Sequence, residues 1–270
     1  MFEGKTILIT GASSGLGEAL GRRLLEEGAD LALAARSEDK LSRLREELRS
    51  RARPDQRVET FPCDVSDPAQ TERVVARLVE TMGPPDMLIN NAGILEEGYF
   101  ESLPLSTFRE VFDVNYFGAL HCTKAVLPHF MQRGAGRIVN IASLGGKIAS
   151  FGYSAYASSK HALVGLTEVL RLELTPQGIG VTLVCPGEFE SPMVEKLNTY
   201  RTRENAVVTH TVPVLPLATV VEEIVSGLAK ERYLIIPGRT ARLVELASRW
   251  FPSLFRRITD GKVARAALRV

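Results

Sequence analysis

The sequence predicts an α/β fold built on one parallel, doubly wound β-sheet of about seven strands, with helices on both faces. Short and almost continuously apolar runs alternate along the chain with longer amphipathic stretches. Such runs are typical of strands buried on both faces, and the stretches between them are typical of the helices that cover those faces. Right-handed crossovers between successive strands then give a doubly wound sheet. No repeat, low-complexity tract or linker interrupts the pattern, so residues 1–270 are predicted to form a single domain.

The elements follow in order from the periodicity of the apolar residues. The predicted strands cover residues 5–10, 31–36, 58–65, 87–91, 136–142, 180–185 and 233–237. The predicted helices cover residues 16–27, 38–51, 68–83, 105–131 and 153–175. Pro68 is suited to the first turn of its helix, and Pro176 with Gly178 ends the last of them.

Charge and composition exclude several classes of function. The chain has 33 Lys and Arg against 32 Asp and Glu, and this net charge of +1 argues against a nucleic-acid partner. Cys63, Cys122 and Cys185 and the four histidines have no metal-ligand or disulfide spacing, so we predict no metal site and a reducing compartment. The first strand begins too early to leave room for a signal peptide, and no apolar run is long enough to cross a bilayer. We therefore expect a cytoplasmic protein.

A glycine-rich turn joins the first predicted strand to the first helix. Residues 10–17 have the sequence TGASSGLG, with glycine at positions 11, 15 and 17. Glycines let the backbone turn tightly and approach a phosphate closely, and the helix that follows offers free N–H groups and a partial positive charge. The turn therefore predicts a dinucleotide pyrophosphate site in a Rossmann fold, the alternative being a turn that binds no ligand.

The end of the second strand indicates which dinucleotide binds. A carboxylate at this place typically binds the ribose 2′-hydroxyl of NAD, but this chain has Ala35 and Arg36 there. An arginine can bind a 2′-phosphate through two hydrogen bonds, whereas a carboxylate would repel it. We therefore predict NADP(H) as the cofactor, the alternative being that Arg36 is a solvated surface residue. Asp39 is interpreted as a charge at a helix N-terminus.

Residues 156–160 have the sequence YASSK, which places Tyr156 and Lys160 four residues apart. On a helix these positions share one face, so the lysine charge can favour the phenolate of a tyrosine, whose ordinary pKa is about 10. Ser143 follows the fifth strand directly, at the edge where ligands bind in open α/β sheets. The three side chains predict acid–base chemistry on a substrate oxygen, the alternative for the Tyr-Lys pair being an exposed helix surface.

Taken together, these segments resemble the short-chain dehydrogenase/reductase family over about residues 4–195. The matching segments are TGASSGLG from Thr10, CDV from Cys63, NNAG from Asn90, VN from Val114, Ser143, YASSK from Tyr156 and PG from Pro186. The resemblance implies that Tyr156 is the general acid and base, that Lys160 lowers its pKa and holds the nicotinamide ribose, and that Ser143 orients the carbonyl. It also implies that Asn115 supports a water molecule behind Lys160.

The same resemblance implies a set of cofactor contacts. They fall at Gly11, Ser13, Ser14, Gly15, Leu16, Gly17, Arg36, Asp64, Val65, Asn91, Gly93, Tyr156, Lys160, Pro186, Gly187, Phe189 and Ser191. The family usually has Thr where this chain has Ser191, and the hydroxyl needed for the nicotinamide carboxamide is retained. Residues 188–216 correspond to the family's variable substrate loop and lid.

The activity implied is NADP(H)-dependent reduction of a ketone or aldehyde, or oxidation of the secondary alcohol, with a small molecule as substrate. Two alternatives remain open, an NAD-linked alcohol dehydrogenase and a cofactor-binding protein of the same fold that performs no chemistry. Family members commonly pair through the helices after the fourth and fifth strands. We therefore expect a homodimer or homotetramer through residues 105–131 and 153–175.

The C-terminal segment is basic as well as apolar. Residues 231–270 carry nine Lys and Arg against three Asp and Glu. Residues 241–258, within a C-terminal extension at 239–270, have an apolar face that includes Trp250 and Phe251 and is flanked by arginines. A basic amphipathic helix with aromatic residues can lie on a membrane, so peripheral membrane contact is one prediction. Packing on the protein body, over the active site or on another subunit is the alternative. The extension also resembles, in composition, that of 3-ketodihydrosphingosine reductases, which implies a hydrophobic or lipid ketone as substrate.

Overall fold

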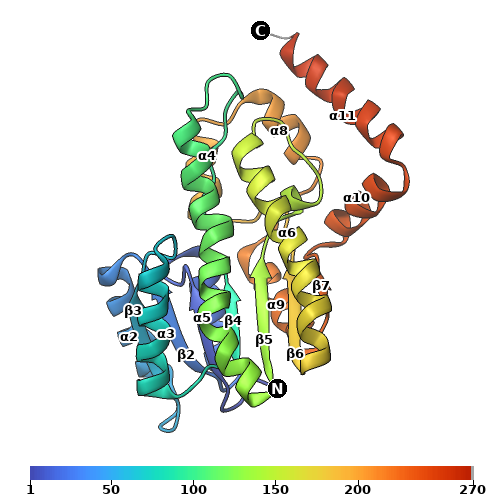
Figure 1. Ribbon diagram of the computed structural model, residues 1–270. Coiled ribbons are helices and arrows are strands. Elements are labelled where there is room, and N and C mark those ends of the chain that lie inside the picture. The colour runs from blue at the N-terminus through green and yellow to red at the C-terminus, as the bar shows by residue number, and fades with distance from the viewer. Residues whose placement is uncertain (269–270) are drawn as a thin grey trace.

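A computed structural model describes residues 1–268 of the chain, and seven parallel strands form one sheet within them (Figure 1). The strands are β1 (Thr6–Thr10), β2 (Asp30–Ala35), β3 (Val58–Pro62), β4 (Met87–Asn90), β5 (Gly136–Ile141), β6 (Ile179–Val184) and β7 (Leu234–Ile235). Their order across the sheet is β3-β2-β1-β4-β5-β6-β7. Strands β2 and β3 lie on one side of β1, and β4 to β7 lie on the other side. This reversal of strand order at β1 confirms the predicted doubly wound α/β fold.

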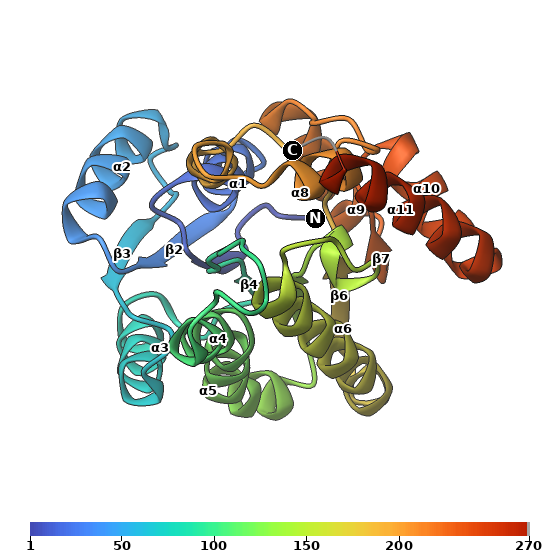
Figure 2. The ribbon, with the colours of Figure 1, turned by 90° about the horizontal axis from the view of Figure 1, so that it is seen from above.

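Helices cover both faces of the sheet, as the view from above shows (Figure 2). One face carries α1 (Gly15–Glu26), α2 (Glu38–Arg51) and α9 (Leu217–Ala229). The other face carries α3 (Pro68–Met82), α4 (Leu105–Phe112), α5 (Gly118–Arg133) and α6 (Ser154–Leu174). The remaining helices are α7 (Pro192–Asn198), α8 (Arg203–Thr209), α10 (Arg239–Trp250) and α11 (Pro252–Ala267).

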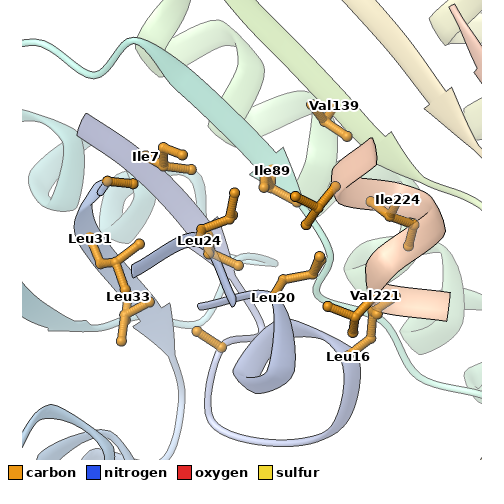
Figure 3. Packing of buried hydrophobic residues seen from close by; sticks show 14 of the residues in the cluster. Ile7, Leu16, Leu20, Leu24, Leu31, Leu33, Ile89, Val139, Val221 and Ile224 are labelled. Atoms are coloured by element: carbon orange, nitrogen blue, oxygen red, sulfur yellow. The ribbon is translucent and has the colours of Figure 1, made fainter. Parts of the chain in front are cut away.

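The core between the sheet and α1 shows why the first helix forms where it does. Leu20 and Leu24 recur at a four-residue spacing, and both are fully buried against β1 and its neighbours (Figure 3). Ile224 of α9 packs into the same cluster. Helix α9 was not predicted from the sequence, although its buried residues recur at the three- and four-residue spacing of an amphipathic helix. The core therefore holds the glycine-rich turn in place, because β1 and α1, which flank the turn, both pack into it.

The predicted helix at 105–131 is continuous but not uniform. A π-helical turn at Asp113–Phe117 separates α4 from α5. Asn115 lies in this turn and is buried. Single π-helical turns inside α-helices occur frequently at functional sites, because they displace one side chain out of the regular helical repeat.

The C-terminal extension forms two helices where one amphipathic stretch was expected. Pro252 lacks the N–H that a helix interior needs, but it suits the first turn of a new helix, so α10 ends at Trp250 and α11 begins at Pro252. Helix α11 packs on α8 at the edge of the sheet toward which the strands point (Figure 1). No helix within residues 1–268 is both long enough and apolar enough to cross a membrane.

Candidate active site

A cavity of about 500 Å³ opens at the C-terminal ends of the strands. It runs from the glycine-rich turn to α11, and every predicted site residue lines it except Gly17 and Asn115. The position agrees with the rule that ligands bind outside the carboxyl ends of the strands in an open α/β sheet. The volume is within the range of small-molecule and cofactor sites.

The glycine-rich turn is held from both sides. Gly11 and Gly15 have φ angles of +65° and +56°, in the left-handed region that favours glycine. A Cβ atom at Gly17 would lie 2.5 Å from the carbonyl oxygen of Gly11, so Gly17 is required for close packing of α1 on the turn. Asn91 donates from Nδ2 to the carbonyl oxygens of Thr10 and Gly11, at 3.0 and 3.3 Å. Asn91 thus fixes the shape of the turn as well as lining the cavity.

The end of β2 gives the cavity a cationic region. Arg36, Ser37 and Lys40 line it together, and the nearby Asp39 does not. Lys40 was missed in the sequence, although it lies four residues after Arg36 at the start of a helix. Across this region the Asp64 carboxylate accepts hydrogen bonds from the backbone N–H and the hydroxyl of Ser66, at 3.0 and 2.7 Å. These bonds hold the carboxylate in one orientation at the cavity wall.

Ser143, Tyr156 and Lys160 meet in the middle of the cavity. The Lys160 ammonium lies 5.8 Å from the centre of the Tyr156 ring and donates a hydrogen bond of 2.9 Å to the carbonyl oxygen of Ile141. The backbone N–H of Gly145 donates to the Ser143 hydroxyl oxygen at 3.0 Å, which orients that side chain. The predicted spacing on one helix face is thereby observed, with Ser143 brought to it from the end of β5.

Burial dominates the protonation of this group. Burial raises the pKa of Tyr156 to about 12, and the interaction with the Ser143 hydroxyl opposes that rise. Burial lowers the pKa of Lys160 to about 8. Both shifts favour the uncharged form, as expected for ionisable groups removed from water. The expected lowering of the Tyr156 pKa by Lys160 stays a prediction.

Asn115 hydrogen-bonds two segments of the chain behind Ser143, Tyr156 and Lys160. Its Oδ1 accepts a hydrogen bond from the backbone N–H of Ile94 at 2.8 Å. Its Nδ2 donates to the carbonyl oxygen of Ile94 and to the Ser159 hydroxyl, both at 3.0 Å. A Cβ atom at Gly93 would lie 3.2 Å from Asn115 Oδ1 and 3.4 Å from the Lys160 ammonium, so the three residues are close neighbours. Asn115 therefore joins the loop after β4 to α6 just behind Lys160.

A largely buried ion pair joins the first residue of the expected substrate loop and lid to a residue further along it. Arg201 donates to Glu188 Oε2 at 2.9 Å, and the two side chains are only 5% and 14% exposed. The Tyr153 hydroxyl donates to Glu188 Oε1 at 3.2 Å, and its ring packs edge-on against Tyr156 with the centroids 5.4 Å apart. Glu188 also lines the cavity. The ion pair was not predicted, because nothing in the sequence pairs these two residues.

The far end of the cavity is mostly apolar and includes the C-terminal extension. Its lining residues there include Leu95, Leu144, Ile148, Val208, Val212, Val244, Phe255, Ile258, Thr259 and Lys262. Four of these, from Phe255 to Lys262, belong to α11. The sequence offered packing over the active site only as one alternative for this segment.

No group of three His, Cys, Asp or Glu side chains within residues 1–268 is arranged to hold a metal ion. Cys63, Cys122 and Cys185 are buried and free of disulfides, as is typical of cysteines that pack as small apolar residues. Burial raises the pKa of the Cys63 thiol to about 11, so this cavity-lining thiol stays protonated near neutral pH.

Comparison with known proteins gives a consistent result. The family model described as short chain dehydrogenase matches residues 5–202. The 3-ketodihydrosphingosine reductase of Bos taurus is 36% identical over 232 residues, which cover 85% of this chain and 70% of that protein. A short-chain dehydrogenase/reductase of Burkholderia phymatum, solved with NAD, superimposes with a TM-score of 0.80 at 28% identity and covers 92% of this chain and 95% of its own. A short-chain dehydrogenase of Sphingobium yanoikuyae, solved with NADPH, gives 0.77 at 29% identity, with 98% and 96% covered.

Proposed function

This chain belongs to the short-chain dehydrogenase family, as its motifs predicted, and from that membership we propose that it is an NADP(H)-dependent reductase of a hydrophobic ketone. Family membership makes it an oxidoreductase that acts on keto or hydroxyl groups of a small molecule and binds a nicotinamide cofactor. The convergence of Ser143, Tyr156 and Lys160 in one cavity is the observation that carries the proposal.

The residues present fit a nicotinamide dinucleotide with a 2′-phosphate. The backbone at Gly15 is in a conformation that favours glycine, and a Cβ there would meet nothing closer than 3.8 Å, so the turn leaves open space for a phosphate. Arg36 and Lys40 supply positive charge where an NAD site would have a carboxylate. Our assignment to the cofactor comprises Gly11, Ser13, Ser14, Gly15, Leu16, Gly17, Arg36, Asp64, Val65, Asn91, Gly93, Tyr156, Lys160, Pro186, Gly187, Phe189 and Ser191.

In this proposal the cofactor supplies the hydride, and the protein orients the substrate and moves the proton. Tyr156 donates its phenolic proton to the substrate oxygen during reduction, and the Ser143 hydroxyl hydrogen-bonds the same oxygen as negative charge develops on it. The positive charge of Lys160 favours the phenolate that remains and holds the ribose. Asn115 keeps the loop behind Lys160 in place through its three hydrogen bonds.

The apolar end of the cavity supports a hydrophobic substrate. Leu144, Val212, Val244 and Phe255 line it, and α7 and α8 within residues 188–216 form the lid beside them. The relative from Bos taurus is named as a reductase of a keto lipid, which favours the same class of substrate. A water-soluble ketone should therefore react more slowly than one with a longer apolar chain.

A screen of NADPH and NADH oxidation over ketones of increasing chain length tests the proposal. Tyr156→Phe removes the transferable proton and should reduce kcat at least about 100-fold. Tyr153→Phe is the matched control, because it removes a neighbouring hydroxyl that only hydrogen-bonds Glu188, and it should retain most of the turnover. Oxidation with NADH alone would favour an NAD-linked dehydrogenase. Cofactor binding without turnover of any ketone or alcohol would favour a non-catalytic protein.

We further propose a cytoplasmic homodimer or homotetramer with peripheral membrane contact. Exposed apolar side chains on α5, on the π-helical turn before it and on α6 would be covered in a two-fold interface between these helices; among them are Met131, Phe117, Val169 and Leu172. Light scattering at micromolar concentration should give the mass of two or four chains. A monomeric mass would contradict this assembly.

A further inference from the structure

Helices α10 and α11 and the residue between them expose six large apolar side chains to the solvent, which we call the outer ridge. It consists of Leu243, Leu246, Trp250, Phe251, Leu254 and Ile258. Trp250 and Phe251 are 70% and 63% exposed, and the other members are about half exposed or more. The spacing of three and four residues places the members of each helix on one side of it. Single exposed apolar residues are ordinary, but six large ones on two consecutive helices indicate an interaction surface.

An adjoining side of the same two helices belongs to the cavity. Phe255, Thr259 and Lys262 of α11 and Val244 of α10 line it, and Ala266 is buried. Ile258 lies between the two sides, since it lines the cavity and is also half exposed in the outer ridge. The ridge and the cavity wall therefore meet at Ile258.

Three arginines without acidic partners lie on α10 and α11, the two helices that carry the outer ridge. Arg249, Arg256 and Arg257 are exposed, and none lies within 4.0 Å of a carboxylate oxygen of residues 1–268. Arg242 differs, because it pairs with Glu223 at 2.7 Å. Arginines on the body of the protein are commonly paired, as Arg45 and Arg49 are with Glu59. Three unpaired guanidinium groups on the two helices that expose the aromatic and aliphatic side chains of the ridge are complementary to anionic lipid headgroups above an acyl layer.

A second copy of this chain is a less favourable partner for the outer ridge than an anionic membrane. In a two-fold interface the same surface occurs on both sides, so the exposed arginines of one subunit would lie near those of the other. Like charges brought together at an interface oppose association. An anionic bilayer meets the same arginines with opposite charge.

We propose that the outer ridge docks on an anionic membrane surface, with the mouth of the cavity turned toward the bilayer. An apolar ketone then passes from the lipid along α11 to Ser143 and Tyr156 without crossing water. The docking itself rests only on the surface described, whereas delivery of the substrate rests on the proposed reductase function. Helix α11 is in this view both the wall of the cavity and the membrane anchor.

Co-sedimentation with vesicles tests the docking in the full chain. We expect binding to vesicles of equal parts phosphatidylcholine and phosphatidylglycerol, weaker binding to phosphatidylcholine alone, and release at about 1 M salt, where charges are screened within about 3 Å. Replacing Arg249, Arg256 and Arg257 together by Gln should reduce binding about 100-fold, since each basic residue near an anionic surface contributes about fivefold. Trp250→Ser with Leu254→Ser should also weaken binding, and this loss should persist at high salt.

A matched variant controls for net charge. Arg49→Gln, Arg51→Gln and Arg53→Gln remove an equal number of positive charges at and just after the end of α2, on the opposite side of the molecule from α10 and α11 (Figure 2). This variant should bind vesicles nearly as well as the unmodified protein. Equal losses in the two arginine variants would overturn the proposal, because binding would then follow net charge and not the ridge.

Activity separates failure of the docking from failure of the reductase function. The Arg249, Arg256 and Arg257 variant should reduce a water-soluble ketone normally but lose kcat/KM for a long-chain ketone embedded in anionic vesicles. If no ketone is reduced while vesicles still bind, the reductase function fails and the docking stands. No vesicle binding by the unmodified protein overturns the docking. A smaller mass by light scattering in the ridge variants would then identify the ridge as a subunit interface.

Discussion

The preference for a 2′-phosphate can be tested at two neighbouring cations, Arg36 and Lys40. A charge-assisted hydrogen bond contributes about 1.5–3 kcal/mol. Arg36 is exposed and its charge is screened by solvent, so the lower end of that range applies, or about tenfold in NADPH affinity. Lys40 is an exposed point charge in the same region, and an exposed charge contact of about 0.5–1 kcal/mol adds a factor of about two to five.

Fluorescence titration with NADPH and NADH measures this preference directly. Arg36→Ala should remove about tenfold of NADPH affinity and leave NADH affinity nearly unchanged, and adding Lys40→Ala should remove most of what remains of the preference. Arg43→Ala is the matched control, because Arg43 is an exposed arginine on α2 that does not line the cavity. Raising the salt concentration should narrow the difference between the cofactors. Equal affinities in the unmodified protein, or an equal loss for both cofactors in Arg36→Ala, would refute the reasoning.

Two further predictions follow from groups buried around the site. Without added cofactor, the free energy of unfolding should rise between pH 8 and 10.5, because in this range Lys160 still carries its proton in the unfolded chain but has released it in the folded state. Thermal melting of Lys160→Met and of the unmodified protein should show that the variant lacks this rise. Arg201→Met leaves the Glu188 carboxylate without its cationic partner and should cost about 3 kcal/mol in denaturant unfolding, whereas the double variant with Glu188→Gln should recover part of that loss. Equal stabilities of the single and double variants would show that the charge of Glu188 is already accommodated by solvent.

Local spacing explains what the sequence could predict. The glycine-rich turn, the end of β2 and the Tyr156–Lys160 pair each depend on residues a few positions apart, and residues of all three line one cavity. Helix α9 could also have been found, since its apolar residues recur at helical spacing. Contacts such as that between Glu97 and Thr202, 105 residues apart, leave no comparable trace in a single sequence. The Glu188–Arg201 ion pair is shorter in range but depends on the path of the loop between them, which composition does not determine.

The C-terminal extension shows how a single amphipathic pattern can conceal two roles. From the sequence, packing on the body and contact with a membrane were alternatives, because the segment was assumed to have a single apolar face. In α11 the residues at 255, 259, 262 and 266 form one stripe, and those at 251, 254 and 258 form another next to it. The first stripe meets the cavity and α8, and the second meets solvent. Because a helix surface is wide enough for both stripes, burial of one leaves the other free to bind a partner, and the two alternatives do not exclude each other.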